Sequence, residues 1–137
     1  MSRSGYSSDL DQQQLAMWRG RVASSIRGVR GQKLLRDIAA FMDAMPVREL
    51  AAGSLKTPGG DFCTLGCAMA HRGLGVPMGD FNEDSDSGAV AERLGIAECL
   101  AQEIAHENDD LSVRESPSER WVRMRKWVAE NTKKSTS

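Results

Sequence analysis

Apolar residues recur every three or four positions through most of this chain, a spacing typical of amphipathic helices. The first apolar stripe consists of Leu15, Trp18, Val22 and Ile26. Its helix is predicted to begin near Asp9 with Ser8 as N-cap, because a serine oxygen can accept a hydrogen bond from a free amide of the first turn. Gly28 and Gly31 follow this stripe and predict a break or bend before the next helix.

A second stripe predicts a helix from about Gln32 to Met45, which Pro46 ends because proline has no backbone donor. The stripe consists of Leu34, Leu35, Ile38, Phe41, Met42 and Met45. Beyond Pro46 the helical spacing is lost, and a Pro-Gly-Gly turn at 58–60 lies between short apolar pieces. This pattern indicates a short β-hairpin or an irregular loop around residues 50–63, packed against the helices.

Three further helices are predicted between this loop and the last helix of the chain. The segment from Thr64 to Gly73 is rich in small residues, so we expect it to be the most buried helix, with Gly73 as its C-cap. A short helix is expected from Ser87 to Leu94. Another is expected from Ile96 to about Glu107.

The last predicted helix has the clearest start signal. Ser116-Pro117-Ser118-Glu119 combines a capping serine, a proline at the first helical position and a glutamate three residues after the serine. Trp121, Met124 and Val128 form its inward stripe. These patterns predict a mainly α fold, a compact bundle of about five to six helices with room for one short β-hairpin around residues 50–63. We expect one helical domain over 9–131, with flexible tails at 1–8 and 132–137.

Composition supports a globular, cytoplasmic protein. The 137 residues are 40% apolar and 27% charged, as expected of one folded domain. No apolar run approaches the roughly 20 residues that span a bilayer, and the N-terminal segment lacks the apolar region of a secretory signal. Three cysteines, Cys63, Cys67 and Cys99, are few for a disulfide scaffold, so we expect reduced thiols.

The net charge of -1 hides a strong segregation along the chain. Residues 1–36 carry seven Arg or Lys against two Asp, a net of +5, and residues 120–137 again carry +5. Residues 76–119 carry twelve Asp or Glu against two Arg, a net of -10. The basic ends and the acidic middle either attract each other within the fold or present separate charged surfaces to partners.

Two patterns suggest metal sites, and each lacks an essential part. Asp80, Asn82, Asp84 and Asp86 alternate as in a calcium-binding EF-hand loop, but Ser85 and Ala91 occupy the positions of the required glycine and bidentate glutamate. Cys63, Cys67 and His71 have helical spacing that suits zinc, with Cys99 or His106 as a fourth ligand, yet no C-x-x-C pair is present. We therefore predict no metal and no other cofactor, although the sequence leaves the Cys63, Cys67 and His71 site open.

No catalytic motif is found, and we expect a protein that is not an enzyme. Residues 106–110, His-Glu-Asn-Asp-Asp, gather titratable groups, but Asp110 stands where a zincin would have its second histidine. The simpler interpretation is a helix C-terminus, at which Asn108 and Asp109 hold the neighbouring loop.

A basic cluster surrounds the junction of the first two predicted helices. It comprises Arg19, Arg21, Arg27, Arg30, Lys33 and Arg36. These side chains suit the phosphates of a nucleic acid, the chain's own acidic segment, or an acidic partner protein. No convincing helix-turn-helix spacing is present, so sequence-specific DNA binding is not expected.

Motifs spread over residues 4–128 resemble an uncharacterised family of small proteins encoded by phages and prophages of proteobacteria. Near the N-terminus these are Ser4-Gly5-Tyr6-Ser7, Trp18-Arg19-Gly20, Ile26-Arg27-Gly28 and Arg30-Gly31-Gln32. Further along they are Cys63-Thr64-Leu65-Gly66, His71-Arg72-Gly73, Leu94-Gly95-Ile96-Ala97, Glu107-Asn108-Asp109 and Arg120-Trp121. Family members often have another residue in place of Cys67. The resemblance implies a phage origin and a bacterial cytoplasm, and it transfers no catalytic residue.

These observations lead to two functional hypotheses. The first is a non-enzymatic phage accessory protein that binds a host or phage protein, for example to inhibit a bacterial defence system such as CRISPR-Cas. Its binding residues would be Asp80, Glu83, Asp84, Asp86, Glu107, Asp109 and Asp110. The second is a nucleic-acid-binding regulator that uses the basic cluster. The sequence leaves open whether two copies form a homodimer, and membrane association is not expected.

Overall fold

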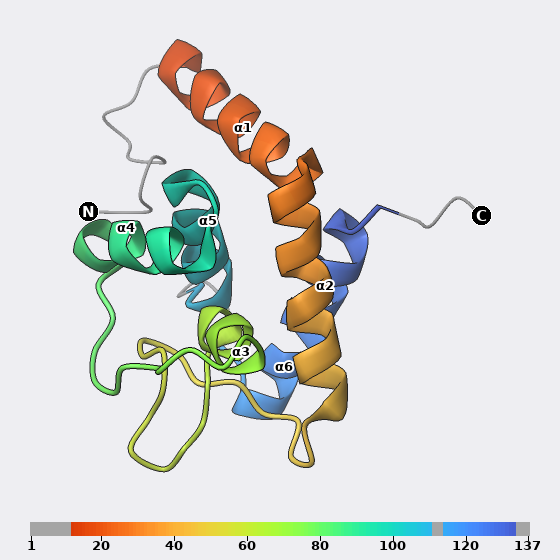
Figure 1. Ribbon diagram of the computed structural model, residues 1–137, viewed down its shortest axis with the longest axis vertical. Coiled ribbons are helices and arrows are strands. Elements are labelled where there is room, and N and C mark those ends of the chain that lie inside the picture. Colours follow the sequence, from red (N-terminus) through yellow and green to blue (C-terminus); the bar gives the residue numbers. More distant parts are fainter. Residues whose placement is uncertain (1–11, 111–113, 134–137) are drawn as a thin grey trace.

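The computed structural model describes residues 12–110 and 114–133, and within them it is mainly helical, with six helices (Figure 1). They are α1 (Gln12–Arg27), α2 (Val29–Ala44), α3 (Thr64–His71), α4 (Glu83–Leu94), α5 (Glu98–Asn108) and α6 (Pro117–Asn131). The predicted fold class is therefore confirmed. None of the described helices is both long enough and apolar enough to cross a membrane.

Helices α2 and α3 form the centre of the molecule. α2 packs against α3 on one side and α6 on the other, while α5 joins α3, α4 and α1. Residues from four helices are completely or almost completely buried in one core: Leu34, Leu35, Ile38, Met42, Leu65, Met69, Leu100, Ile104, Met124 and Val128. α1 packs on α2 and α5 through its second half and extends beyond the body of the molecule (Figure 1).

The prediction that α3 is the most buried helix is confirmed, since every residue from Thr64 to Met69 is buried. Gly66 permits this burial, because a Cβ atom at that position would collide with the carbonyl oxygen of Leu55. The predicted ends of α3 and α6 are also confirmed. Gly73 has φ 71 directly after the C-cap of α3. Ser116 and Glu119 form the reciprocal capping box, with Pro117 at the first helical position.

The break between the first two helices is shorter than predicted. α2 begins at Val29, three residues before the predicted start, because Gly28 alone adopts an extended conformation (φ -70, ψ 166) and serves as N-cap. Gly31 lies inside α2, and a Cβ atom there would collide with the carbonyl oxygen of Ser25. Glycine at this position therefore allows a close approach of α1 and α2. The predicted start of α1 at Asp9 lies outside the described residues.

The start predicted for α4 at Ser87 is wrong by one turn, because Asn82 provides the cap instead. The Asn82 side-chain oxygen accepts a hydrogen bond from the Ser85 amide (3.2 Å), and the Asp86 carboxylate accepts one from the Asn82 amide (2.8 Å). Ser87 is fully buried within the helix. Asp86 is thus part of a helix cap rather than of a calcium-binding loop.

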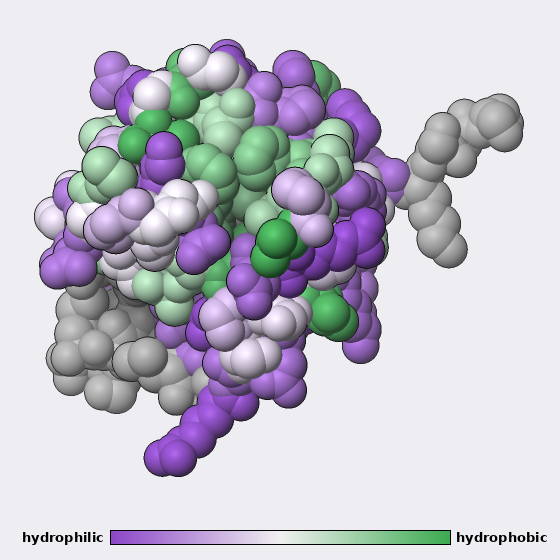
Figure 2. Space-filling model, turned by 90° about the horizontal axis from the view of Figure 1, so that it is seen from below, coloured by the Kyte–Doolittle hydropathy of each residue, from purple (hydrophilic) through white to green (hydrophobic). Residues whose placement is uncertain are grey.

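No β-strand forms in the described part of the chain. The segment predicted as a hairpin contains one antiparallel bridge, between Lys56 and Phe62, which closes the turn at 57–61. Lys56 also forms a bridge with Met78, and Ser54 forms one with Asp80, so the loops at 51–62 and 74–82 lie side by side. Seen from below, apolar residues gather in the middle and upper part of the surface, and hydrophilic residues lie mainly toward its margins (Figure 2).

Candidate functional site: an acidic surface around Gly53

The end of α5 holds the start of α3 through the buried Asn108, which is 1% exposed. The Asn108 side-chain oxygen accepts hydrogen bonds from the amide (3.0 Å) and the hydroxyl (2.8 Å) of Thr64. Its side-chain nitrogen donates to the carbonyl of Ala51 (2.9 Å) and to the Asp109 carboxylate (2.7 Å). The prediction that Asn108 and Asp109 hold a neighbouring loop is confirmed.

Gly53 joins the two parts of the predicted acidic site. Its amide donates to the Asp109 carboxylate (3.0 Å), and its carbonyl accepts a hydrogen bond from the amide of Phe81 (2.9 Å). The next residue, Ser54, forms a bridge with Asp80. The chain before α4 and the end of α5 therefore meet at one place although almost thirty positions separate them in sequence. We call Asp80 and Asp109 at this junction, together with Glu107 and Asp110 next to Asp109 at the end of α5, the acidic surface.

The seven acidic candidates have different surroundings. Asp80 is exposed, whereas Glu107, Asp109 and Asp110 at the end of α5 are half-buried. Asp86 is also half-buried and caps the start of α4. Glu83 and Asp84 lie in the first turn of α4, and their side chains are outside the described part of the molecule. Asp109 and Asp86 accept hydrogen bonds from backbone amides, which leaves their negative charge in place.

Three other acidic residues form the ion pairs that the structure shows inside the fold. Burial would raise the pKa of Asp37, but hydrogen bonds from Arg72 (2.8 Å) and Lys33 (3.2 Å) outweigh it and hold that pKa below its ordinary value. Arg72 also donates to the carbonyl of Leu94 at the end of α4 (2.6 Å). This buried carboxylate thus links α2, α3 and α4.

Glu115 and Asp43 make the other two of these pairs. Glu115 accepts hydrogen bonds from Nη2 and Nε of the Arg123 guanidinium (2.6 and 2.9 Å), which lower the pKa of this carboxyl despite its burial. Asp43 is paired with Arg125 in the same way (2.8 and 3.0 Å), and its pKa is also lowered. Within the segment 76–119, Glu115 pairs with Arg120 and Arg123 of the basic C-terminal segment, and the charges of Glu107 and Asp110 also act on Arg123.

The predicted basic cluster is divided among several faces, although all six side chains are exposed. At 3.6 residues per turn, Arg19 and Arg27 lie within about 80° of each other on α1, whereas Arg21 lies between about 120° and 160° away from them. The Arg21 guanidinium lies 6.0 Å from the centre of the Trp18 ring.

The members on α2 are divided in the same way. Arg30 lines a hollow of about 490 Å³ against the start of α5, and Lys33 pairs with Asp37 on the side of α3. Arg36 faces the side on which α6 packs, one turn after Gln32. The six residues therefore do not form the single interface that the sequence suggested.

Cys63 and Cys67 are buried within the apolar core. Burial raises the pKa of the Cys63 thiol to about 12 and also raises that of Cys67. The Cys63 sulfur accepts a hydrogen bond from the amide of Gly66 (3.4 Å) as N-cap of α3. His71 instead lies 3.8 Å from the Asp37 carboxylate. Among the described residues, no three His, Cys, Asp or Glu side chains are grouped so that they could hold a metal ion.

Comparison with protein-family models, with curated proteins and with solved structures finds no match to this chain. The resemblance to phage-encoded proteins therefore stays a prediction. Sequence reasoning missed two residues, Gly53 and Gln32, whose hydrogen bonds join segments that are distant in the chain. Gly53 carries no signal beyond a turn-forming residue, with φ 75, and Gln32 has the helical spacing of an ordinary surface position.

Proposed function

We propose that this protein is a non-enzymatic binding protein that docks through its acidic surface on a basic surface of another protein. The observation that carries the proposal is the junction at Gly53, where Asp109 and the chain next to Asp80 are fixed by backbone hydrogen bonds. A set of carboxylates held on a rigid frame loses little conformational entropy when it meets a complementary surface.

The charge distribution supports the same proposal. The segment 76–119 carries a net charge of -10, and Asp80 within it is exposed. An excess of charge of one sign steers a partner of the opposite sign and raises the rate of association. Basic protein surfaces most often bind nucleic acid, so an array of carboxylates would compete with phosphates there.

The partner in this proposal is a host or phage protein, in line with the resemblance to phage-encoded proteins. Occupying the nucleic-acid-binding surface of a defence protein, such as a CRISPR-Cas effector, would inhibit that defence. This requires no catalytic step and no cofactor. The single nucleic-acid interface suggested by the sequence has less support, because the helical spacing divides the basic cluster.

The test is capture of a partner from a nuclease-treated proteobacterial lysate by the tagged full chain. We expect one protein in near-stoichiometric amount, released as salt screens the charges. Asp80→Asn with Asp110→Asn should abolish capture. Glu92→Gln with Glu98→Gln is the matched control, because both carboxylates are exposed and lie outside the acidic surface. This double variant removes the same amount of charge. Equal capture by both double variants would refute the proposal.

A further inference from the structure

Gln32 holds the ends of two helices against the start of α2. Its side chain is almost fully buried, with 5% exposed. The side-chain nitrogen donates to the carbonyl of Ile26 (2.7 Å) near the end of α1 and to that of Asn131 (3.1 Å) at the end of α6. The side-chain oxygen accepts a hydrogen bond from the amide of Lys133 (2.7 Å). One side chain therefore holds three segments together: the end of α1 six positions before it, the start of α2 and the end of α6, 99 positions after it.

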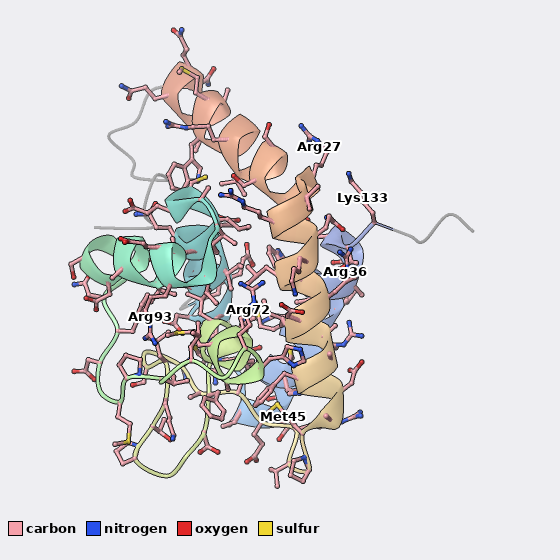
Figure 3. All side chains as sticks on the ribbon, viewed as in Figure 1. Arg27, Arg36, Met45, Arg72, Arg93 and Lys133 are labelled. Carbon is pink, nitrogen blue, oxygen red and sulfur yellow. The ribbon has the colours of Figure 1, made fainter. Side chains whose placement is uncertain are left out.

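Each of the three segments carries an exposed cation next to this junction. Arg27 follows Ile26, Lys133 is bound through its own amide, and Arg36 lies one turn after Gln32 on α2. Figure 3 shows Arg27, Arg36 and Lys133 on the same side of the molecule. The negative end of a helix dipole accounts for a cation at the end of α1 or α6. It does not account for Arg36, which lies in the middle of α2.

A groove of about 470 Å³ lies between α1 and the end of α6, beside Arg27. Arg19 and Arg27 line it, above a floor formed by Val22, Ala23 and Ile26. Eight residues separate the two arginines, which corresponds to about 12 Å along the helix. Glu130 also lines the groove and is the one carboxylate among its lining residues.

We propose that Arg19, Arg27, Arg36 and Lys133 form a basic face that binds the phosphate backbone of a nucleic acid. The cations are spread over α1, α2 and the segment that follows α6, so they suit a chain of phosphates rather than one isolated anion. Three of the four are arginines, whose planar guanidinium groups donate paired hydrogen bonds to phosphate oxygens. The groove floor offers apolar side chains but no base-reading side chain, so the binding is independent of sequence.

This inference goes beyond the proposed function and does not depend on it. The acidic surface lies at the loops around Gly53, whereas the basic face lies at the junction of α1, α2 and α6 around Gln32. Each can therefore be tested by variants that leave the other unchanged.

The experiment is fluorescence anisotropy of the full chain with a labelled DNA duplex of about 20 base pairs in about 50 mM salt. We expect Arg27→Ala with Arg36→Ala to weaken binding about tenfold and to reduce the slope of log K against log salt by about two, because each of the two arginines neutralises one phosphate. Arg21→Ala with Arg30→Ala is the matched control, because it removes two exposed arginines from other faces. Its affinity should change less than about twofold.

A third variant excludes misfolding as the explanation. Glu130→Gln removes the carboxylate from the groove and should strengthen binding about two- to threefold, which a damaged protein would not do. Poly-glutamate at equal charge should compete poorly with the duplex. No binding by the natural chain, equal losses in the two arginine pairs, or full competition by poly-glutamate would each overturn the proposal.

Discussion

The side-chain oxygen of Asn108 accepts both hydrogen bonds that Thr64 can donate, from its amide at 3.0 Å and from its hydroxyl at 2.8 Å. Both residues are buried, so water cannot replace either bond. A polar network of this kind stabilises the fold only while every member is satisfied.

Replacing Asn108 by leucine is therefore expected to destabilise the protein strongly. The change leaves the Thr64 amide and hydroxyl and the Ala51 carbonyl without their present partner in a site closed to water. We expect a loss of about 3 kcal/mol or more in the free energy of unfolding, measured by urea denaturation. Thr64→Val removes one donor and should cost less. A loss below that of Thr64→Val would contradict the role assigned to Asn108.

Alanine substitutions at two glycines, one in α1 and one in α2, are expected to change the stability in opposite directions. Gly31→Ala places a methyl group against the carbonyl oxygen of Ser25, so the two helices must separate, and we expect a loss of about 2 kcal/mol. Gly20→Ala places the same group where nothing lies within 4 Å. Alanine is the better helix former, so this variant should gain up to about 1 kcal/mol. Thermal unfolding of both variants measures the difference, and a gain in stability in both would show that helix propensity alone decides.

Stability should fall in acid because of Asp37. Its pKa is lower in the folded protein than in the unfolded chain, so the unfolded chain takes up a proton first as the pH falls. The stabilisation is complete above about pH 5 and is lost as the pH falls through about 4 and below. Urea denaturation between pH 3 and 7 measures it.

The matched variants for this effect are Asp37→Asn and Asp43→Asn. The Asp37 side chain is 12% exposed and that of Asp43 is 51% exposed, so solvent weakens the second pair. We expect Asp37→Asn to flatten the acid profile clearly more than Asp43→Asn does. Identical profiles for the two variants would rule out Asp37 as the main source of the acid dependence.

The three thiols should differ in reactivity. Burial raises the pKa of Cys63 to about 12 and also raises that of Cys67, so neither forms a thiolate at neutral pH. Cys99 is half-buried, with its sulfur 3.5 Å from the Ser25 hydroxyl. With Ellman's reagent at pH 8 we expect one thiol to react in the native protein and the other two only after unfolding. The Cys99→Ser variant should lose the native reaction, and a reactive Cys63 or Cys67 would contradict their burial.

The parts of the fold that the sequence predicts correctly are those that depend on local helix signals. The stripes of α2 and α6, the capping box at Ser116 and the glycine that ends α3 at position 73 depend on neighbours within about one turn, and all are found as expected. The start predicted for α4 is wrong because two capping residues are available, Asn82 and Ser87. Burial of Ser87 against the core decides between them.

The sequence by itself determined the helical class, the segregation of charge along the chain and which residues are charged, because these follow from periodicity and composition. Only the tertiary structure decided which charges come together. Gly53 joins Asp109 to the chain beside Asp80, and Gln32 places Arg27, Arg36 and Lys133 on one side. The physical reason is that both junctions are hydrogen bonds between segments distant in the chain. Their partners are chosen by how the helices pack, and no local pattern of residues encodes that choice.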